Sequence, residues 1–370
     1  MSRDLRRMYR TAVPAESLPE TISLTMGDAH FTFHKISWKE DDETLGLRYG
    51  TNPHQAAAVY KPDNPEKIFF GDMKLLKSGK SGLSATNVED GYRALRIVNY
   101  FSKPAAAVMK HLNPSGVGVA YGDNDKLVDV FEKAWSGDLR AAYGSVVGFN
   151  VPMDRGVAEN IIEEKKYVEC LFAPGYAPKV LELLEEKRDL RIVEVPKADN
   201  MLEKLFPYEM KVFGDVLLLE QPFYTKLRSM EDLSELEKDK KTGVVTKRSP
   251  TEQEQQDLLC AWWVCCEKRS NGVVIWKKDK VLGVGTGQQD RIGAIEIALA
   301  RARRCGHDLR GSVLASDGYM LWDNVDPLAE VGVTAVIQPG GSVSDKELID
   351  KCNQHGISMV FTGERVFRHF

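Results

Sequence analysis

The chain has 370 residues, more than one ordinary domain holds, so we expect two or three domains. Hydrophobic residues make up 43% and charged residues 28%, as in a typical water-soluble globular protein. The net charge of −4 argues against a nonspecific nucleic-acid binder. The six cysteines form no Cys-x-x-Cys motif, the N-terminus lacks the apolar core of a signal peptide, and no apolar run reaches the ~20 residues of a membrane span. We therefore expect a cytoplasmic protein with reduced thiols and no membrane contact.

The first 46 residues are weakly patterned and are predicted to form an N-terminal extension. Within them, residues 21–36 alternate between apolar and polar side chains around Gly27 and Asp28, which predicts a β-hairpin. We assign this extension no chemistry.

From Leu47 onward, strands and helices alternate, which predicts an α/β fold with layered sheets. Residues 47–200 form the predicted first half, 201–250 a charged connection, and 251–370 the predicted second half. Strands are expected at 104–112, 144–150, 167–176, 190–195, within 272–285, and at 311–317, 334–341 and 358–363. Helices are expected at 125–134, 155–166, 179–187, 252–268, 291–304, 327–331 and 345–355.

Polar, glycine-containing segments follow several of these strands, where open α/β sheets bind ligands. Lys110 and His111 come at the polar end of a buried strand, and the neighbouring ammonium favours a neutral imidazole that accepts a proton. The next four residues, 113–116, are predicted to form a turn that presents backbone N–H groups to an anion. A strand that ends in two solvated residues is the alternative interpretation.

Four other segments carry polar or aromatic groups but are weak signals singly. Residues 47–55 join a cation, a phenol and an imidazole in one loop, and 283–291 place glycines before a helix without forming a dinucleotide fingerprint or a P-loop. Residues 316–324 bracket two aromatic side chains with carboxylates and suit a flat heterocycle, although core aromatics near a helix cap fit equally. Residues 361–370 are basic and aromatic, which favours a docked tail over a frayed one.

Taken together and in order, these segments resemble the transformylase part of bacterial bifunctional AICAR transformylase/IMP cyclohydrolase proteins. The resemblance is carried by LRYGTNPHQ, KHLNPSG, GVGTGQQDR and VTAVIQPGGSVSDKELID with GISMVFTGERVFRH. The resemblance runs from about Leu47 to His369. It implies two cytidine-deaminase-like three-layer α/β/α halves and a homodimer with interface active sites. It also implies AICAR and 10-formyltetrahydrofolate as substrates and no catalytic metal. The sequence agrees on the last point, because the His-x-Glu and Pro-Cys-x-x-Cys zinc ligands of deaminases are missing.

The resemblance assigns roles residue by residue. Lys110 and His111 match a catalytic Lys-His pair, and Asn271 matches a catalytic-site Asn. Nucleotide-binding positions are matched by Arg48, Tyr49, Asn87, Tyr143, Gly144, Glu169, Arg188, Arg291, Arg365, Phe367 and His369. Folate-binding positions are matched by Tyr319, Trp322 and Asp323.

Two departures from the family pattern leave alternatives open. The folate segment, 316–324, is one residue shorter than in the family and lacks its Phe-Pro-Phe, so an altered pterin carrier or a nucleotide-binding paralogue without folate chemistry is possible. About 46 residues with no cyclohydrolase pattern stand where the cyclohydrolase domain is expected, so ring closure is assigned to a separate IMP cyclohydrolase. A deaminase-like nucleotide hydrolase, which would need a metal, is the other alternative.

The expected reaction is formyl transfer from 10-formyltetrahydrofolate to the 5-amino group of AICAR, which gives formyl-AICAR in purine biosynthesis. That amine is a weak nucleophile, because its lone pair is delocalised. His111 is therefore predicted to act as general base, with Lys110 stabilising the oxyanion or protonating N10. The 5′-phosphate is assigned to Arg48, Arg188 and Arg365.

Overall fold

The computed structural model describes residues 18–370 except 41, 65–68, 80, 123, 203–205 and 235–241. Residues 1–17 of the predicted extension and part of the predicted connection lie outside this description. The chain divides into two compact units, each built from two stretches of sequence. Unit 1 comprises Met1–Asn99 and Gly144–Phe223, and unit 2 comprises Tyr100–Tyr143 and Tyr224–Phe370. The units differ from the predicted halves, because residues 100–143 group with the C-terminal part of the chain. The predicted domain boundaries stay a prediction.

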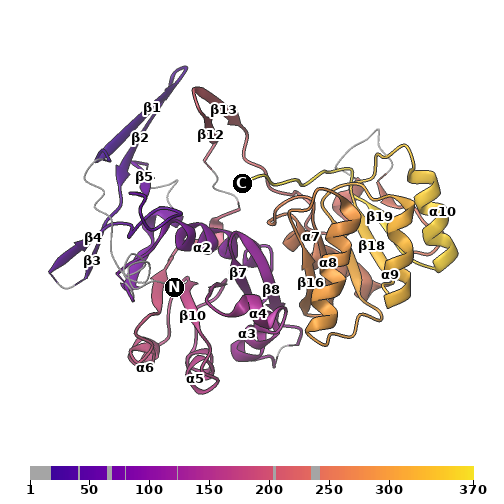
Figure 1. The fold of residues 1–370 in the computed structure, drawn as a ribbon, viewed down its shortest axis with the longest axis horizontal. Coiled ribbons are helices and arrows are strands. Elements are labelled where there is room, and N and C mark those ends of the chain that lie inside the picture. Colours follow the sequence, from indigo (N-terminus) through magenta and orange to yellow (C-terminus); the bar gives the residue numbers. More distant parts are fainter. Residues whose placement is uncertain are drawn as a thin grey trace. The chain divides into compact units, whose positions relative to one another are not determined.

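A mixed sheet organises unit 1. Its strands pair in the order β9 (Ser145–Phe149), β10 (Val168–Ala173), β11 (Arg191–Glu194), β6 (Lys74–Lys77). The first three run parallel and β6 is antiparallel to β11. Helices α5 (Arg155–Glu163) and α6 (Val180–Leu184) follow β9 and β10, as Figure 1 shows.

Helix α2 (Ala85–Val98) lies against β9 and β10. Its approach depends on glycine, because a Cβ on Gly148 would lie 2.6 Å from the Cβ of Ala94 and one on Gly91 would overlap the ring of Phe172. The helix begins at a capping box in which Ser84 and Asn87 exchange side-chain and backbone hydrogen bonds. The site segment around Arg48 is therefore fixed beside the N-terminus of α2, since the Arg48 N–H donates to the Leu83 carbonyl.

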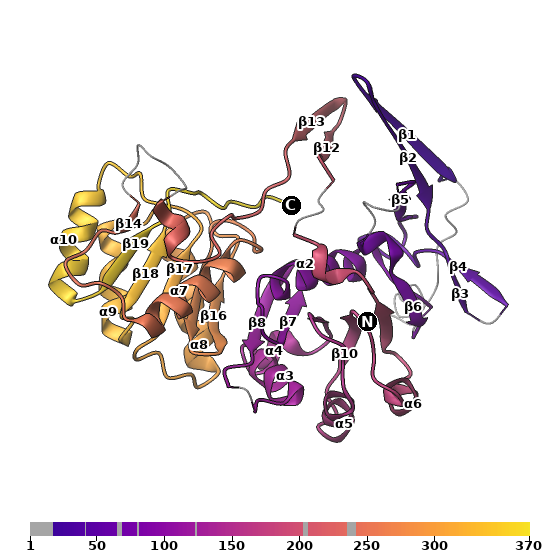
Figure 2. The same ribbon diagram turned by 180° about the vertical axis from the view of Figure 1, so that it is seen from behind.

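Unit 1 also carries small hairpins, which Figures 1 and 2 show from both sides. They are β1 (Thr21–Met26) with β2 (Ala29–Lys35) and β5 (Tyr60–Pro62), β3 (Trp38–Glu40) with β4 (Glu43–Leu45), and β12 (Glu209–Phe213) with β13 (Val216–Glu220). The β1–β2 hairpin confirms the prediction for residues 21–36, with Gly27 at φ 58° in the turn.

A second mixed sheet organises unit 2. Its strands pair in the order β14 (Gly243–Val244), β19 (Ser358–Phe361), β18 (Ala335–Gln338), β17 (Val313–Ser316), β15 (Val273–Lys277), β16 (Lys280–Gly285), β8 (Asn113–Val119), β7 (Ala105–Lys110). Strands β17, β18 and β19 are parallel, whereas β15–β16 and β7–β8 are antiparallel hairpins. The unit therefore joins a small parallel sheet to two hairpins.

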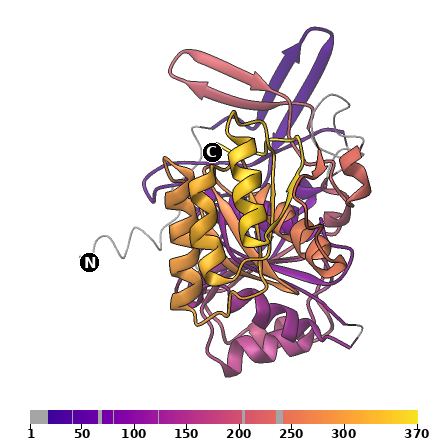
Figure 3. The ribbon, with the colours of Figure 1, turned by 90° about the vertical axis from the view of Figure 1, so that its right-hand side faces the viewer.

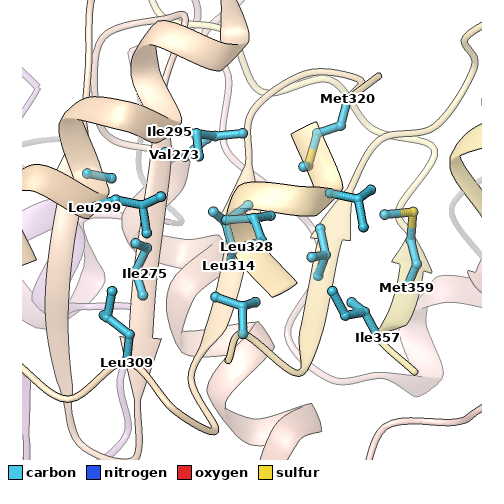
Figure 4. Close-up of a cluster of buried hydrophobic side chains, with 14 of the residues drawn as sticks. Val273, Ile275, Ile295, Leu299, Leu309, Leu314, Met320, Leu328, Ile357 and Met359 are labelled. Carbon is cyan, nitrogen blue, oxygen red and sulfur yellow. The ribbon is translucent and has the colours of Figure 1, made fainter. Parts of the chain in front are cut away.

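Helices cover both faces of the unit 2 sheet. They are α3 (Leu127–Trp135), α4 (Leu139–Ala142), α7 (Glu252–Cys265), α8 (Arg291–Arg304), α9 (Val325–Val331) and α10 (Asp345–His355). Helices α8, α9 and α10 lie side by side on one face in Figure 3, and their apolar side chains meet alternate residues of β15, β17 and β19 in one buried core, drawn in Figure 4. Helix α7 packs against β15 and β17 with side chains outside this core.

Most predicted strands and helices are confirmed, and α8 has the predicted bounds. One prediction is wrong: residues 113–116 are not a turn. Asn113–Val119 forms strand β8, which pairs with β7 so that Lys110 is opposite Asn113. Pro114 fits this strand because the register shifts at Val108/Met109, where a β-bulge accommodates the residue that lacks an N–H.

Candidate active site

The Lys110-His111 pair lies at the tip of the β7–β8 hairpin. His111 and Leu112 are the two turn residues, with φ angles of 51° and 65°. Two consecutive left-handed residues define a type I′ turn, which normally uses Asn and Gly, so this turn is strained. The imidazole is exposed, and the Lys110 Nζ donates to the Tyr143 carbonyl at 2.8 Å. The hairpin therefore presents an imidazole and an ammonium from consecutive residues.

Asn113 connects this hairpin to the loop before β15. Its Nδ2 donates to the His111 carbonyl at 3.1 Å, and its Oδ1 accepts from the Arg269 N–H at 3.0 Å. The same loop carries Asn271, whose Nδ2 donates to the carbonyls of Gln288 and Gln289 at 3.2 and 3.1 Å. Two of the predicted site segments, 110–116 and 283–291, are thus held to one loop.

Arg291 continues this network from the N-terminus of α8. Its Nη2 donates to Asn271 Oδ1 at 2.8 Å, and its Nη1 donates to Asp317 Oδ1 at 2.5 Å and to the Gly272 carbonyl at 2.9 Å. Asp317 Oδ2 accepts from Lys268 Nζ at 2.6 Å, and the side chains of Lys268 and Asp317 are fully buried. Lys268 was not singled out from the sequence, and Asp317 was noted only as one of the carboxylates that bracket the aromatic side chains of 316–324. The sequence signal for Lys268 is a lysine four residues before a glycine at a buried strand. The signal for Asp317 is the Asp of Ser-Asp-Gly.

The C-terminal tail docks onto the same group of segments, as predicted. The Val366 N–H donates to the Asp317 carbonyl at 3.1 Å. The ring of Phe367 lies 5.9 Å from that of His369, and the Arg365 guanidinium lies 4.6 Å above the Phe367 ring. Within unit 2, the contacts therefore bring together the hairpin, the Asn271 loop, Arg291 and the tail.

The predicted folate segment presents its aromatic side chains to solvent. Tyr319 and Trp322 are 53% and 51% exposed, so the alternative of two core aromatics is wrong. Asn324 accepts from the Leu321 N–H at 3.0 Å, while Asp323 is exposed and accepts from Asn324 Nδ2. Asn324, and not Asp323, therefore holds this turn.

A cavity of about 710 Å³ opens beside this segment. Its lining includes Tyr319, the Gly340-Gly341 turn, Lys346 and Arg365. Both glycines have positive φ angles, 73° and 91°. Its walls also include the carboxylates of Asp345 and Asp350, so an aromatic ring, two cations and two carboxylates line one cavity, which suits a polar ligand with a flat ring.

Unit 1 holds a separate group of predicted site residues. Arg48 is 2% exposed, its Nη2 donates to the Tyr49 hydroxyl at 2.8 Å, and its guanidinium lies 4.4 Å above the Tyr49 ring. Burial and the neighbouring charge of Arg191 both lower the pKa of Arg48. Two buried guanidinium groups close enough to repel each other favour a bound anion.

Glu169 connects the remaining unit 1 residues. Its Oε1 accepts from Asn87 Nδ2 at 3.4 Å and from Arg191 Nη1 at 3.3 Å. Arg191 is fully buried, and its Nε donates to the Gly82 carbonyl at 2.9 Å. Arg188 is exposed in the loop between α6 and β11. Arg191 is therefore the basic residue that contacts Glu169 and lies near Arg48, and sequence reasoning missed it. Its place at the start of an apolar strand was the available signal.

The last two predicted residues are consecutive. Tyr143 is 65% exposed and ends α4, and its carbonyl accepts the Lys110 ammonium. Gly144 begins the second stretch of unit 1 at φ 68°, which favours glycine.

Neither a metal site nor a membrane span is found in the described part of the chain. No group of three or more His, Cys, Asp or Glu side chains there is arranged to hold a metal ion. Likewise, no helix in that part has the length and apolarity that crossing a membrane requires.

Comparison with known proteins gives a consistent result. The family model described as AICARFT/IMPCHase bienzyme matches residues 18–301. The bifunctional purine biosynthesis protein PurH of Anoxybacillus flavithermus is 36% identical over 363 residues, which cover 98% of this chain and 63% of that protein. The PurH of Magnetococcus marinus is 39% identical over 332 residues, covering 88% of this chain and 59% of that protein.

Among solved structures, a diaminohydroxyphosphoribosylaminopyrimidine deaminase/5-amino-6-(5-phosphoribosylamino)uracil reductase from Thermotoga maritima is 23% identical, with a TM-score of 0.20 over 26% of this chain and 31% of that one. A match this weak carries no argument about the fold. The family model and the PurH relatives, by contrast, cover most of the chain. The chain belongs to the AICARFT/IMPCHase bienzyme family and spans about 60% of the length of its PurH relatives.

Proposed function

We propose that the chain is an AICAR formyltransferase, which transfers the formyl group of 10-formyltetrahydrofolate to the 5-amino group of AICAR and gives formyl-AICAR. The observation that carries the proposal is the strained hairpin turn that presents Lys110 and His111, held through Asn113 to the loop of Asn271. Strained backbone persists where the surrounding structure holds it, and it clusters at functional sites. Family membership supplies the substrate class.

In the proposed reaction, the amine attacks the formyl carbon and His111 accepts the proton that the amine loses. The bond between the formyl carbon and N10 of the folate then breaks, and N10 takes up a proton. Such a general base is worth ~10²–10⁴-fold in rate. The Lys110 ammonium, held by the Tyr143 carbonyl, stabilises the transient oxyanion by its positive charge.

Asn271 has a more restricted role than the sequence suggested. Both amide hydrogens donate to backbone carbonyls, and Oδ1 accepts from Arg291. Only one lone pair of Oδ1 is left for the substrate, because an amide oxygen accepts two hydrogen bonds. We therefore propose that Asn271 accepts a hydrogen bond from the 5-amino group and orients it.

We propose that charged and polar side chains recognise the nucleotide. In unit 1, we propose that Arg48 and Arg191 bind an anionic group, with Tyr49, Asn87 and Glu169 completing the recognition. The earlier assignment of the 5′-phosphate to Arg48, Arg188 and Arg365 stays a prediction, as do the roles of the other residues matched to the nucleotide. They are Tyr143, Gly144, Arg291, Phe367 and His369.

Tyr319 and Trp322 are proposed to stack on the pterin, and Asp323 to bind its amino group. Their half-exposed rings and the exposed carboxylate support this role, since a ring that is to stack on a ligand must be accessible. We further propose that no catalytic metal takes part and that the enzyme acts in the cytoplasm. The cytidine-deaminase-like halves also remain a proposal.

We propose that the chain acts as a homodimer. The β12–β13 hairpin supports this, because Met210 and Val212 lie opposite Leu219 and Leu217 and give one of its faces only exposed apolar side chains. A solvent-exposed apolar patch of this kind is typical of an interaction surface. Sedimentation analysis of the purified chain tests the assembly: a dimer is expected, and a monomer at micromolar concentration would contradict it.

The function is tested by incubating the purified chain with AICAR and 10-formyltetrahydrofolate and measuring release of tetrahydrofolate. Turnover that requires both substrates is expected, with formyl-AICAR accumulating. A chain that binds AICAR calorimetrically yet transfers no formyl group would be a nucleotide-binding paralogue. Release of ammonia from a nucleotide without folate would instead identify a hydrolase.

A further inference from the structure

A buried group of three charged side chains lies directly behind Asn271. The Asp317 carboxylate accepts from Lys268 Nζ at 2.6 Å through Oδ2 and from Arg291 Nη1 at 2.5 Å through Oδ1. Lys268 and Asp317 are fully buried, and the Arg291 side chain is 9% exposed. Each carboxylate oxygen of Asp317 thus accepts a hydrogen bond from one cation.

This group is packed against the backbone and cannot shift without moving other parts of the site. A Cβ on Gly272 would lie 2.2 Å from Lys268 Nζ, so the lysine fills the space beside that glycine. Asp317 itself donates from its backbone N–H to the Gly272 carbonyl at 3.3 Å, and its carbonyl accepts from Val366 in the tail. Removing one member of a buried ion pair leaves an uncompensated charge, so such a group strongly favours one geometry.

The guanidinium of Arg291 transmits this geometry to Asn271. Its Nη1 is fixed by Asp317 and by the Gly272 carbonyl, and its planar group then directs Nη2 at Asn271 Oδ1, 2.8 Å away. Asn271 cannot rotate its amide to compensate, because exchanging Oδ1 and Nδ2 would point an N–H group at the guanidinium. The orientation of Asn271 therefore depends on Asp317 through one intermediate side chain.

We propose that Asp317 is a positioning residue for the formyl transfer, acting through Arg291 on Asn271. Lys268 donates to the second carboxylate oxygen and, because ammonium and guanidinium groups are both donors, has no hydrogen bond to Arg291. This inference rests on the proposed function. It distinguishes the two partners of one buried ion pair: Asp317 governs the reaction, whereas Lys268 governs mainly the stability of the fold.

The test compares Asp317→Asn with Lys268→Met, which break the same ion pair from opposite sides. The amide introduced by Asp317→Asn has one acceptor oxygen for two cations, so its NH₂ group must face either Lys268 or Arg291. We expect kcat/KM for AICAR to fall about 100-fold, since a 1 Å misplacement can cost this much. In Lys268→Met the contact between Asp317 and Arg291 survives, so kcat/KM is expected to stay within about threefold.

The double variant Lys268→Met/Asp317→Asn separates positioning from a purely structural role. Without the ammonium, the amide oxygen is free to face Arg291, so kcat/KM is expected to recover about tenfold over Asp317→Asn alone. All variants are assayed at a temperature where circular dichroism shows them folded. Equal losses in Asp317→Asn and Lys268→Met, or no recovery in the double variant, would overturn the proposal. If Asp317→Asn does not fold, Lys268→Met decides against wild type, because a loss of about 100-fold in kcat/KM in that variant would overturn the proposal as well.

Failure of the proposed function gives a different result. Wild-type chain that transfers no formyl group contradicts formyl transfer itself. The effect of Asp317 on the orientation of Asn271 is then measured through AICAR binding, as the dissociation constant from calorimetry. It is expected to rise in Asp317→Asn and to recover in the double variant, and an unchanged constant in all variants would contradict the role of Asp317.

Discussion

The turn that carries His111 is expected to sacrifice stability for activity, and His111→Gly tests this. An L-residue in the left-handed region costs roughly 1–2 kcal/mol, which glycine relieves. Glycine itself loses roughly 0.5–1 kcal/mol in backbone entropy on folding. Because the His111 side chain is exposed, its removal forfeits little burial. At φ 51°, the variant should therefore be more stable by roughly 0.5–1 kcal/mol.

The same variant should lose ~10²–10⁴-fold in kcat if the imidazole is the general base. Urea unfolding measures the stability and initial-rate formylation measures the activity. His111→Asn is the matched control, because Asn tolerates the left-handed region and has no basic nitrogen. It should keep wild-type stability within about 0.5 kcal/mol and lose the same activity.

Two results would refute this reasoning. Near-wild-type turnover by folded His111→Gly would remove the imidazole from the reaction. A His111→Gly variant less stable than wild type would show that the turn is not strained, or that the side chain makes a stabilising contact. Loss of activity with a gain in stability is the pattern that a functional strained turn predicts.

Three further predictions follow from single contacts. Arg191→Met should weaken AICAR binding more than tenfold and Arg188→Ala less than twofold in calorimetry, since a hydrogen bond to a charged group is worth about 1.5–3 kcal/mol and ~1.4 kcal/mol is tenfold in affinity. Equal effects would contradict the assignment of Arg191. Burial tends to raise the pKa of Glu254, but hydrogen bonds from Arg248 lower it to about 2, so its contribution to stability should be present above pH 4.5 and be lost as the pH falls toward 2. The stability difference between wild type and Glu254→Gln, measured by urea unfolding, should shrink over that range. Trp322→Ala should raise KM for the folate and leave KM for AICAR unchanged in steady-state assays.

The regular elements were predictable because local signals agree with the fold. Helix α8 is an example: Asp290 caps its N-terminus by accepting from the Gly293 N–H, and arginines occupy its last turn. The β1–β2 hairpin has glycine in its turn and alternating strands on either side.

The β7–β8 hairpin was missed because its turn lacks those signals. His111 and Leu112 are not turn formers, whereas the following Asn-Pro-Ser-Gly is, and only the sheet pairing forces Asn113 and Pro114 to be extended. Tertiary pairing here overrides local propensity.

The site was predictable at the level of segments and less so at the level of single residues. Charge alone does not separate Arg188 from Arg191, three positions apart, because burial is decided by the start of strand β11. Asp317 lies within a segment that was singled out for its aromatics, and its partners come from residues 26 and 49 positions away in the chain. Contacts at that sequence separation leave no periodic pattern to detect.

Gly318 offers a last test of how the site segments depend on one another. A Cβ at this position would lie 2.6 Å from Cε1 of Phe367 and 2.7 Å from Nη2 of Arg291. Arg291 is held by Asp317, Asn271 and the Gly272 carbonyl, so the Phe367 ring is the group that must move.

In Gly318→Ala, the displaced Phe367 ring should take the Arg365 guanidinium with it and loosen the tail. We expect faster amide hydrogen exchange over residues 363–370 and a higher KM for AICAR. Gly122→Ala is the control, because a Cβ there meets nothing within 4 Å. Unchanged hydrogen exchange in Gly318→Ala would mean that Arg291 moves in place of Phe367. The hydrogen bonds around Asp317 would then hold Arg291 less rigidly than their burial implies.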